Sequence, residues 1–350
     1  MKGNVSLLVI FLILLLLLPC VSLFTKSAAP QRSGSSHAAV SQTTVNSPAA
    51  SSKKPKAAVS AAPVPGKKSG KSFRIYDQTQ KSILTVDELD FLRGTVATEM
   101  SPDSPKEALK AQTVAAYTYY ARQRNLHRQK PDAALQGADF SCETGSWRIY
   151  VTQQQMQQRW KEDYSTFYTN LASAVESVYG QVLRSGKELV NATYCSISSG
   201  QTEDAAAVWG KAYPCLLPVA SPGDIYAAGY LSSVSMTPAE FQKAAENLGC
   251  RLSGSPAGWA GSCQRTASGM VSILSLGGKS VKGTDVRTAF GLRSANFSLA
   301  YTGGRFVFSV KGYGHGVGMS QAGATAMAKE GETYQHILAW YYPGSTLAAL

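Results

Sequence analysis

Residues 310–321, with the sequence VKGYGHGVGMSQ, place a glycine at every second position around a single histidine. Glycine adopts positive φ without strain, and its missing Cβ lets the main chain come close to a ligand or to another stretch of backbone. Because the interior of a helix or strand tolerates such a run poorly, the pattern predicts a tight, exposed turn. His315 would then be held on a rigid loop. The four glycines are Gly312, Gly314, Gly316 and Gly318.

The amino-terminal part of the chain has the composition of a membrane segment followed by a tether. Residues 5–24 carry no charge and could cross roughly 30 Å of hydrocarbon as a helix. A secretory signal usually has a shorter apolar region of about 7–15 residues, although Ser27-Ala28-Ala29 offers a cleavage site. We expect residues 1–24 to be a transmembrane anchor, with a removed signal segment as the alternative. Residues 25–72, mainly Ser, Ala, Pro, Thr and Lys, are expected to be a disordered tether.

Most of the positive charge precedes the folded part of the chain. Residues 1–72 contain nine Lys or Arg and no Asp or Glu, so they carry +9 of the net +12. The remaining 25 basic and 22 acidic residues leave residues 73–350 with only +3. A nucleic-acid-binding domain usually carries its basic patch on the folded part, so we expect no nucleic-acid partner. The distribution favours a basic tail near anionic lipid or wall polymer, or a linker that only improves solubility.

Beyond the tether, mixed patterns predict a single α+β domain at residues 73–350. Thr85 begins a capping box, and apolar residues then recur at helical spacing. A second helix is expected from Ser104 as N-cap and Pro105 in the first turn to about Gln123, through an Ala-rich run. Further helices are expected at residues 237–248 and 285–290, and strands at 181–183, 188–196, 269–276 and 305–310.

Five of the six cysteines follow the tether, and this odd number leaves at least one thiol unpaired if disulfides form. Cys250 and Cys263 bracket a loop rich in Gly, Ser and Pro and are the most plausible pair. Cys195 with Cys215 is the next. The sequence alone establishes neither disulfide.

Glu99 is the strongest candidate for acid–base chemistry. The first expected helix ends beside it, and the turn Ser-Pro-Asp-Ser-Pro that follows would place its carboxyl group at a surface cleft. A helix C-terminus carries partial negative charge, which disfavours ionisation and raises a carboxyl pKa. Such a group suits proton donation. Because an isolated glutamate is more often a solvated surface residue, motifs elsewhere in the chain decide between the two interpretations.

Three blocks of sequence provide those motifs. They are the Glu-Met pair with EALKAQTVAAYTYYARQ at residues 99–123, SSGQTE with WG and SPGD at 198–224, and GHGVGMSQ with YYPG at 314–344. In this order they resemble the SpoIID/LytB family of sporulation and cell-wall proteins. The resemblance covers residues 73–345, which chance similarity does not explain.

The resemblance implies a peptidoglycan lytic transglycosylase with Glu99 as its catalytic acid/base. Such an enzyme cuts the β-1,4 bond between MurNAc and GlcNAc, and attack by the sugar's own C6 hydroxyl leaves a 1,6-anhydro end. Ordinary glycoside hydrolysis needs two carboxylates, whereas this reaction can proceed with one. No cofactor is expected. Six further residues are expected to contact substrate: His315, Ser320, Gln321, Ser199, Thr202 and Glu203.

Two departures from the family pattern bear on this expectation. Tyr117 stands where the family usually has an arginine, which removes a positive charge and would alter an ion pair near the active site. Some members also carry a His/Cys metal cluster after the catalytic helix. This chain offers Cys142 and a distant His127 there, with Ser146-Trp147 where a second ligand is expected. Since a closed zinc site needs four ligands, we predict no metal.

Two other functions stay open. A Cys/His wall hydrolase would use Cys195 as nucleophile and His315 as base, although no orienting Asp or Asn motif accompanies them. A non-catalytic wall protein would bind peptidoglycan or modify the activity of an amidase, as LytB-type relatives do.

The resemblance also implies a cellular setting. It suggests glycan strands as substrate, and a wall amidase and membrane sporulation proteins as partners, during the engulfment stage of sporulation. With an amino-terminal anchor, the protein would be a single-pass component of the cell membrane. Its catalytic domain would then lie outside the cytoplasm and face the cell wall.

Overall fold

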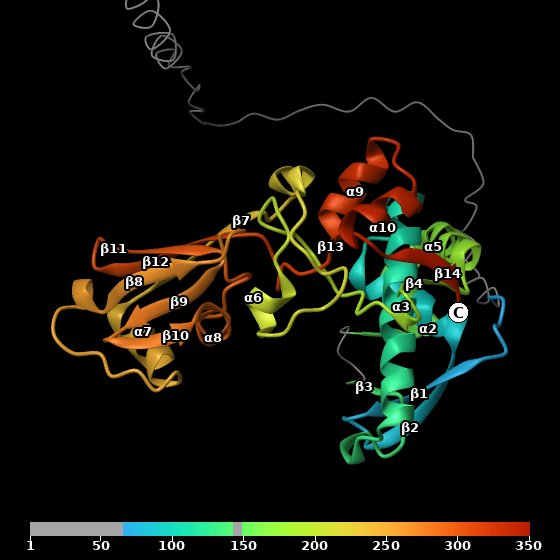
Figure 1. The fold of residues 1–350 in the computed structure, drawn as a ribbon, viewed down its shortest axis with the longest axis horizontal. Helices are drawn as coiled ribbons and strands as arrows, with labels where there is room; N and C mark the ends of the chain where they lie inside the picture. The colour runs from blue at the N-terminus through green and yellow to red at the C-terminus, as the bar shows by residue number, and fades with distance from the viewer. Residues whose placement is uncertain (1–65, 143–148) are drawn as a thin grey trace, which may run out of the picture. The chain divides into compact units, whose positions relative to one another are not determined.

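The computed structural model describes residues 66–142 and 149–350 (Figure 1). The expected transmembrane anchor and residues 25–65 of the expected tether lie outside this part of the chain. Within the described ranges, no helix is both long and apolar enough to cross a bilayer. Helices and strands are mixed without regular βαβ alternation, which confirms the α+β class.

Helix α2 (Glu88–Glu99) ends at the candidate acid, as the sequence predicted, but it does not begin where expected. Its N-cap is Asp87, whose carboxylate accepts from the main-chain N–H groups of Leu89 and Asp90. The expected capping box at Thr85 is wrong because Thr85 lies in strand β2 (Ser82–Asp87) and is paired with a neighbouring strand.

Helix α3 (Lys106–Gln129) packs against α2 and six other elements of this part of the chain. Its N-cap is Pro105 and carries no side-chain cap, so the expected cap at Ser104 is wrong. The helix also extends six residues beyond the expected end at Gln123, because Arg124 and Arg128 form ion pairs that hold its last turns. The small-residue face expected for this helix is fully buried and consists of Ala108, Ala111 and Ala115.

The remaining elements of this part are short. Strand β1 pairs antiparallel with β2 and parallel with β3, and β4 pairs antiparallel with β5 and β14. The expected strand at residues 188–196 is interrupted, since a turn in which the Thr193 N–H bonds the Asn191 carbonyl separates β5 from β6. The bounds are β1 (Ser72–Asp77), β3 (Phe140–Cys142), α4 (Gln153–Trp160), α5 (Tyr164–Val178), β4 (Gln181–Ser185), β5 (Glu188–Leu189), β6 (Tyr194–Cys195), α6 (Ala205–Trp209), β13 (Met319–Ser320), α9 (Gln321–Lys329), α10 (Tyr334–Tyr341) and β14 (Thr346–Ala349).

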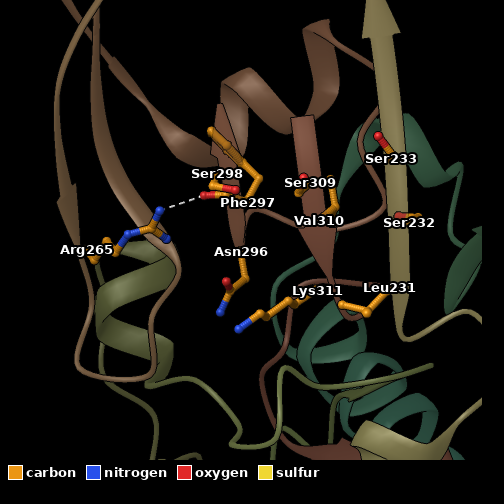
Figure 2. Close-up of a pocket in the computed structure, with 10 residues that line it drawn as sticks. All are labelled: Leu231, Ser232, Ser233, Arg265, Asn296, Phe297, Ser298, Ser309, Val310 and Lys311. Carbon is orange, nitrogen blue, oxygen red and sulfur yellow. Dashed lines mark hydrogen bonds between the residues drawn. The ribbon is translucent and has the colours of Figure 1, made fainter. Parts of the chain in front are cut away.

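Residues 231–311 form a strand-rich lobe with a core of its own. Two antiparallel sheets, β11-β12-β7 and β10-β9-β8, enclose that core, and Figure 2 shows one end of the first sheet. Phe241 stacks on Phe306 at a ring-centroid distance of 3.8 Å. The bounds are β7 (Leu231–Met236), α7 (Pro238–Glu246), β8 (Ala260–Arg265), β9 (Val271–Leu276), β10 (Lys279–Lys282), α8 (Gly283–Ala289), β11 (Phe297–Thr302) and β12 (Arg305–Lys311).

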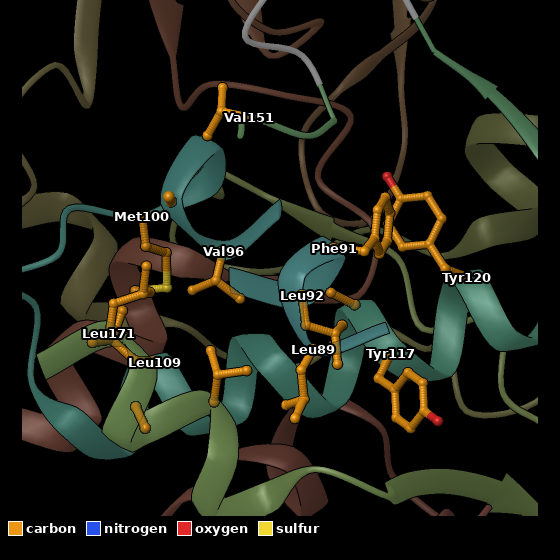
Figure 3. Close-up of a cluster of buried hydrophobic side chains, with 14 of the residues drawn as sticks. Leu89, Phe91, Leu92, Val96, Met100, Leu109, Tyr117, Tyr120, Val151 and Leu171 are labelled. Carbon is orange, nitrogen blue, oxygen red and sulfur yellow. The ribbon is translucent and has the colours of Figure 1, made fainter. Parts of the chain in front are cut away.

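The core beneath α2 fixes the direction in which Glu99 points. Leu89, Leu92 and Val96 recur at helical spacing and are almost completely buried against α3 and α5 (Figure 3). Full burial of such a side chain is worth roughly 1.5–3 kcal/mol. Gly94 lies on the same helix. A larger residue would not fit at this position, because a Cβ there would come 2.2 Å from the carbonyl oxygen of Val151. The apolar face therefore sets the rotation of α2, and with it the position of its last residue.

The glycine-rich run is not the exposed turn that its sequence predicted. It lies against residues 193–203, where β13 pairs parallel with β6 and single bridges join Tyr313 to Ile197 and Val317 to Glu203. Gly318 has φ +79°, and a Cβ there would lie 2.0 Å from the Thr193 carbonyl oxygen. The predicted close approach is therefore confirmed, and its partner is another main-chain segment.

The expected disulfides are absent from the described residues. Cys195, Cys215, Cys250 and Cys263 are all free thiols, and the first three are buried.

Candidate active site

A groove of about 680 Å³ lies where the C-terminal end of α2 meets α9; we call it the Glu99 groove. Gly223 lets the chain approach α9 here, since a Cβ would come 2.4 Å from that of Ala326. Tyr226 lines the groove and is 85% exposed, so its ring is available for contact with a ligand. The lining residues come from four segments, at residues 99–104, 196–197, 222–228 and 321–330.

Glu99 is half-buried in this groove and has one side-chain partner among the described residues. Burial raises the pKa of its carboxyl group, and a hydrogen bond from Gln321 partly opposes the rise. The direction agrees with the sequence-based expectation, and its largest cause is burial. Gln321 Nε2 donates to Glu99 Oε2 at 3.0 Å. Because this bond occupies Oε2, Oε1 is the oxygen left to hold an acidic proton toward substrate.

Gln112 of α3 fixes the orientation of Gln321. The same Gln321 Nε2 donates to Gln112 Oε1 at 3.3 Å, so both of its protons point into the protein and toward Glu99. Gln112 is fully buried, and its own Nε2 has no hydrogen-bond partner within the described part of the chain. Sequence reasoning missed Gln112. The available signal was a polar residue four positions after Ala108, on the helix's buried small-residue face.

Two tyrosines lie near the same carboxyl group. Burial raises the pKa of Tyr120 and of Tyr194, and the negative charge of Glu99 raises both further. Their hydroxyl groups therefore stay protonated at neutral pH and add no charge beside Glu99.

A buried aspartate holds the start of α9 and thereby Gln321. Ser320 is the N-cap of α9, where its Oγ accepts from the Gly323 N–H at 3.2 Å and donates to Asp224 Oδ1 at 2.6 Å. Asp224 Oδ2 also accepts from the Ser198 N–H at 3.1 Å. Burial raises the pKa of Asp224, and the serine hydrogen bonds oppose the rise. Ser320 thus has a positioning contact, and its expected contact with substrate stays a prediction.

His315 lies away from the Glu99 groove. It lines a separate pocket of about 170 Å³ with Tyr119, Thr193 and Tyr194. Its Nδ1 accepts from the Val317 N–H at 3.1 Å. Burial lowers the pKa of His315 to about 4, with a further contribution from a nearby arginine, so the ring is neutral at neutral pH. Its expected contact with substrate stays a prediction.

The SSGQTE motif of the second sequence block is also outside the Glu99 groove. Thr202 is fully buried, and its Oγ1 accepts from the Val219 N–H at 2.9 Å. Glu203 is 1% exposed, and its Oε1 accepts from the Met270 N–H at 3.2 Å; burial raises the pKa of this carboxyl group. Ser199 is half-buried, and its Oγ donates to a main-chain carbonyl. Six residues were expected to contact substrate, and of these the structure places Gln321 against Glu99.

The tyrosine that departs from the family pattern is not near Glu99. Tyr117 donates to Glu88 Oε2 at 2.5 Å, and Arg124 forms an ion pair with the other oxygen of the same carboxylate. Glu88 is the first residue of α2, about 16 Å from Glu99 along the helix axis. The expectation of an altered ion pair near the active site is therefore wrong, since the ion pair lies at the far end of α2 and Arg124 supplies its positive charge.

Neither a metal site nor an active cysteine emerges from the described residues. These residues contain no cluster of three or more His, Cys, Asp or Glu that could hold a metal ion. Ser146-Trp147, at the position of an expected ligand, lie outside them. Burial raises the pKa of Cys195 to about 12, so its thiol is protonated at neutral pH and is a poor nucleophile.

Comparison with known proteins identifies the family of the chain. The family model of the stage II sporulation protein, SpoIID, matches residues 76–184, which include Glu99 and Gln112. Stage II sporulation protein D of Bacillus subtilis (strain 168) is 34% identical over 280 residues, and that of Bacillus amyloliquefaciens is 33% identical over 279; each match covers 79% of both chains. The amidase enhancer of Bacillus subtilis (strain 168) is 28% identical over 74% of this chain and 40% of its own length. The chain therefore belongs to the SpoIID family of stage II sporulation proteins.

Proposed function

We propose that the protein is a peptidoglycan lytic transglycosylase that cuts the MurNAc–GlcNAc β-1,4 bond in the Glu99 groove. The observation that carries the proposal is the half-buried Glu99, whose raised pKa and single hydrogen bond from Gln321 suit a general acid. Tyr226, exposed on the groove, would stack on a sugar ring.

The burial of the acidic groups in the groove favours one catalytic carboxylate over two. Glu330 is the other acidic residue that lines the groove in the described part of the chain, and it is exposed to solvent, whereas Glu99 is half-buried. Ordinary glycoside hydrolysis uses a pair of carboxylates. An intramolecular reaction needs no second carboxylate, since the C6 hydroxyl of the substrate is the nucleophile.

The proposed reaction is balanced in protons. Protonated Glu99 donates from Oε1 to the glycosidic oxygen as the bond between MurNAc C1 and that oxygen breaks, which frees the 4-hydroxyl of GlcNAc. The C6 hydroxyl of MurNAc then bonds C1 and gives its proton to the Glu99 carboxylate. The products are a 1,6-anhydroMurNAc end and a GlcNAc end, and Glu99 is protonated again without consumption of water.

We further propose that this reaction serves cell-wall remodelling during engulfment in a sporulating cell. The family relationship supports this setting, and the amidase enhancer relative supports a wall amidase as a partner. An uncharged run at residues 5–24 would anchor the protein in the cell membrane with the domain facing the wall.

A second candidate function is a non-catalytic wall protein that modifies an amidase. The similarity to the amidase enhancer favours it. Under this function, the protein would bind peptidoglycan and change the rate of an added amidase, but it would release no glycan fragments by itself.

Product analysis separates these two functions. The purified protein is incubated with intact peptidoglycan and with peptidoglycan stripped of its stem peptides, and released fragments are identified by mass spectrometry. Fragments with 1,6-anhydroMurNAc ends would support the transglycosylase. Reducing MurNAc ends would instead indicate a hydrolase, and the absence of fragments together with retained binding would favour the non-catalytic protein.

Replacement of Gln321 should shift the pH dependence of activity. In Gln321→Met, Glu99 loses the hydrogen bond that opposes the effect of burial, so its pKa rises further. Since the general acid must be protonated, activity falls as pH rises through this pKa, and the alkaline limb of the profile should move to higher pH. The maximal rate should fall about ten- to a hundredfold, the usual value of a hydrogen bond to a charged group.

The matched control for this change is Thr325→Val. Thr325 lies one turn further along α9, and its Oγ1 donates to the Gln321 carbonyl oxygen, so valine keeps its shape and leaves the Gln321 side chain in place. Rates of fragment release are measured from about pH 4 to 9 for both variants. An alkaline limb that moves to lower pH in Gln321→Met, or moves equally in both variants, would contradict the proposed role of Gln321.

A further inference from the structure

Positive charge is concentrated on the strand-rich lobe. Residues 231–311 contain nine Lys or Arg and three Asp or Glu, which gives a net charge of +6. Because residues 73–350 together carry only +3, the rest of that region has a net charge of −3. Residues 73–350 are therefore nearly neutral in total, although the lobe within them is basic. A purely structural role does not require such a concentration of positive charge.

A second groove, of about 540 Å³, lies on this lobe at one end of sheet β11-β12-β7; we call it the basic groove. No Asp or Glu is among the residues that line it. Figure 2 shows Lys311 and Asn296 extending from the same end of the sheet, and Arg265 reaching the groove from β8.

Strand alternation explains the chemistry of the groove floor. Phe306, Phe308 and Val310 of β12 point into the core, so the residues between them point outward. Ser309 therefore faces solvent, and its neighbours across the sheet are Ser233 of β7 and Ser298 of β11. These residues make a band of hydroxyl groups, and Lys311 lies at the end of it.

The two cations of the groove have no acidic partner among the described residues. Arg265 donates from Nη1 to the Gly269 carbonyl at 2.8 Å and from Nη2 to the Phe297 carbonyl at 2.7 Å, which holds the guanidinium group in place. Lys311 is exposed and forms no ion pair in the described part of the chain. A cation that is already held in position loses little side-chain entropy when it binds an anion.

We propose that the basic groove is an auxiliary binding site for the carboxylate groups of peptidoglycan. Charge complementarity identifies the ligand: uncompensated cations attract the carboxylates of the polymer, and the serine hydroxyls with Asn296 can hydrogen-bond its sugar and amide groups. The identity of the polymer rests on the proposed function. The groove shares no lining residue with the Glu99 groove, so it would hold the polymer without taking part in the reaction.

The test measures binding of the full chain to purified sacculi free of teichoic acid, by co-sedimentation at low salt. All proteins carry Glu99→Gln, so the sacculi stay intact and the result does not depend on catalysis. Lys311→Glu is expected to bind roughly three- to tenfold more weakly, because it replaces attraction by repulsion at the groove. Lys243→Glu, an exposed lysine on α7 against the opposite face of the sheet, makes the same charge change on the lobe and should bind normally.

Two further arms identify the anion. On sacculi whose carboxylates have been converted to amides, Lys311→Glu and Lys243→Glu should bind equally. On walls that retain teichoic acid, the ratio of Lys311→Glu binding to Lys243→Glu binding should be the same as on stripped sacculi. Equal binding of the two variants to untreated sacculi would overturn the proposal, and so would a difference that survives amidation. A difference seen only with teichoic acid would assign the groove to phosphodiesters instead.

Discussion

Glu99→Gln is expected to lower the release of anhydro-ended fragments by about 10²–10⁴-fold, the usual contribution of a general acid or base. The same carboxyl group both donates and accepts the proton in the proposed reaction, so its loss affects both steps. Glutamine keeps the shape of the side chain and can still accept the Gln321 hydrogen bond through its own oxygen. The fold should therefore be retained, and thermal unfolding of the variant checks this directly.

Glu330→Gln is the matched control, because it neutralises the other carboxylate that lines the Glu99 groove. If one carboxylate suffices, this variant keeps most of its activity and still produces anhydro ends. A loss of similar size in both variants would point to a two-carboxylate hydrolase and would contradict the proposed mechanism. Activity that survives Glu99→Gln would remove Glu99 from the catalytic role altogether.

The position of Glu99 could be predicted from the sequence because local patterns determine it. Leu89, Leu92 and Val96 define one buried face of a helix, and the Pro-containing turn after Glu99 ends that helix. The groove around Glu99 needed the structure, since its opposite wall comes from α9, more than 200 residues further along the chain. The resemblance named Gln321 as a contact of substrate, and the structure shows its bond to Glu99.

Burial of polar residues is the feature that the sequence did not disclose. Ser320, Thr202 and Glu203 belong to family motifs and were expected to face substrate, yet all three are almost completely buried. Motif membership does not distinguish a residue that touches a ligand from one that holds the loop in place. Gln112 was missed for the opposite reason, because it lies within an Ala-rich helix that the sequence explains by packing alone.

The same limitation applies to charge. The total for residues 73–350 is small, and the sequence by itself gave no reason to consider residues 231–311 separately. The structure shows that residues 231–311 form a lobe, because their two sheets enclose an aromatic core of their own. Likewise, Tyr117 was read as the loss of a charge because its partner Glu88 and the compensating Arg124 meet only in the folded chain.

Arg124→Met is expected to be the most destabilising of the changes considered, at about 3–5 kcal/mol, because it leaves a buried charge without its ionic partner. Glu88 is completely buried and accepts from Tyr117 and Tyr179 as well as from Arg124. Burial alone would raise the pKa of Glu88, but these three partners outweigh it and hold the pKa below its usual value. In the variant the effect of burial prevails and the pKa rises.

The sign of the pH dependence follows from these two directions. In the wild type, a lowered pKa gives stability that is fully present above about pH 4.5 and is lost as pH falls through the folded-state value. In Arg124→Met, the raised pKa of Glu88 makes the loss of stability largest at neutral pH. Protonation of Glu88 reduces this loss as pH falls. The difference in unfolding free energy should therefore be largest near pH 7 and shrink toward pH 4, as measured by urea unfolding.

Arg122→Met is the control for the loss of a positive charge on α3. Arg122 lies two residues earlier on the same helix and forms no ion pair among the described residues, so its replacement should change stability by less than about 0.5 kcal/mol. Tyr117→Phe should give an intermediate loss of about 1–3 kcal/mol, since it removes one hydrogen bond from a buried carboxylate that keeps its ion pair. If Arg124→Met behaved like Arg122→Met, or if its effect grew as pH fell, then Glu88 would not depend on Arg124 for its charge. Tyr117 and Tyr179 would then be the partners that keep Glu88 charged, through the hydrogen bonds that they donate to its carboxylate.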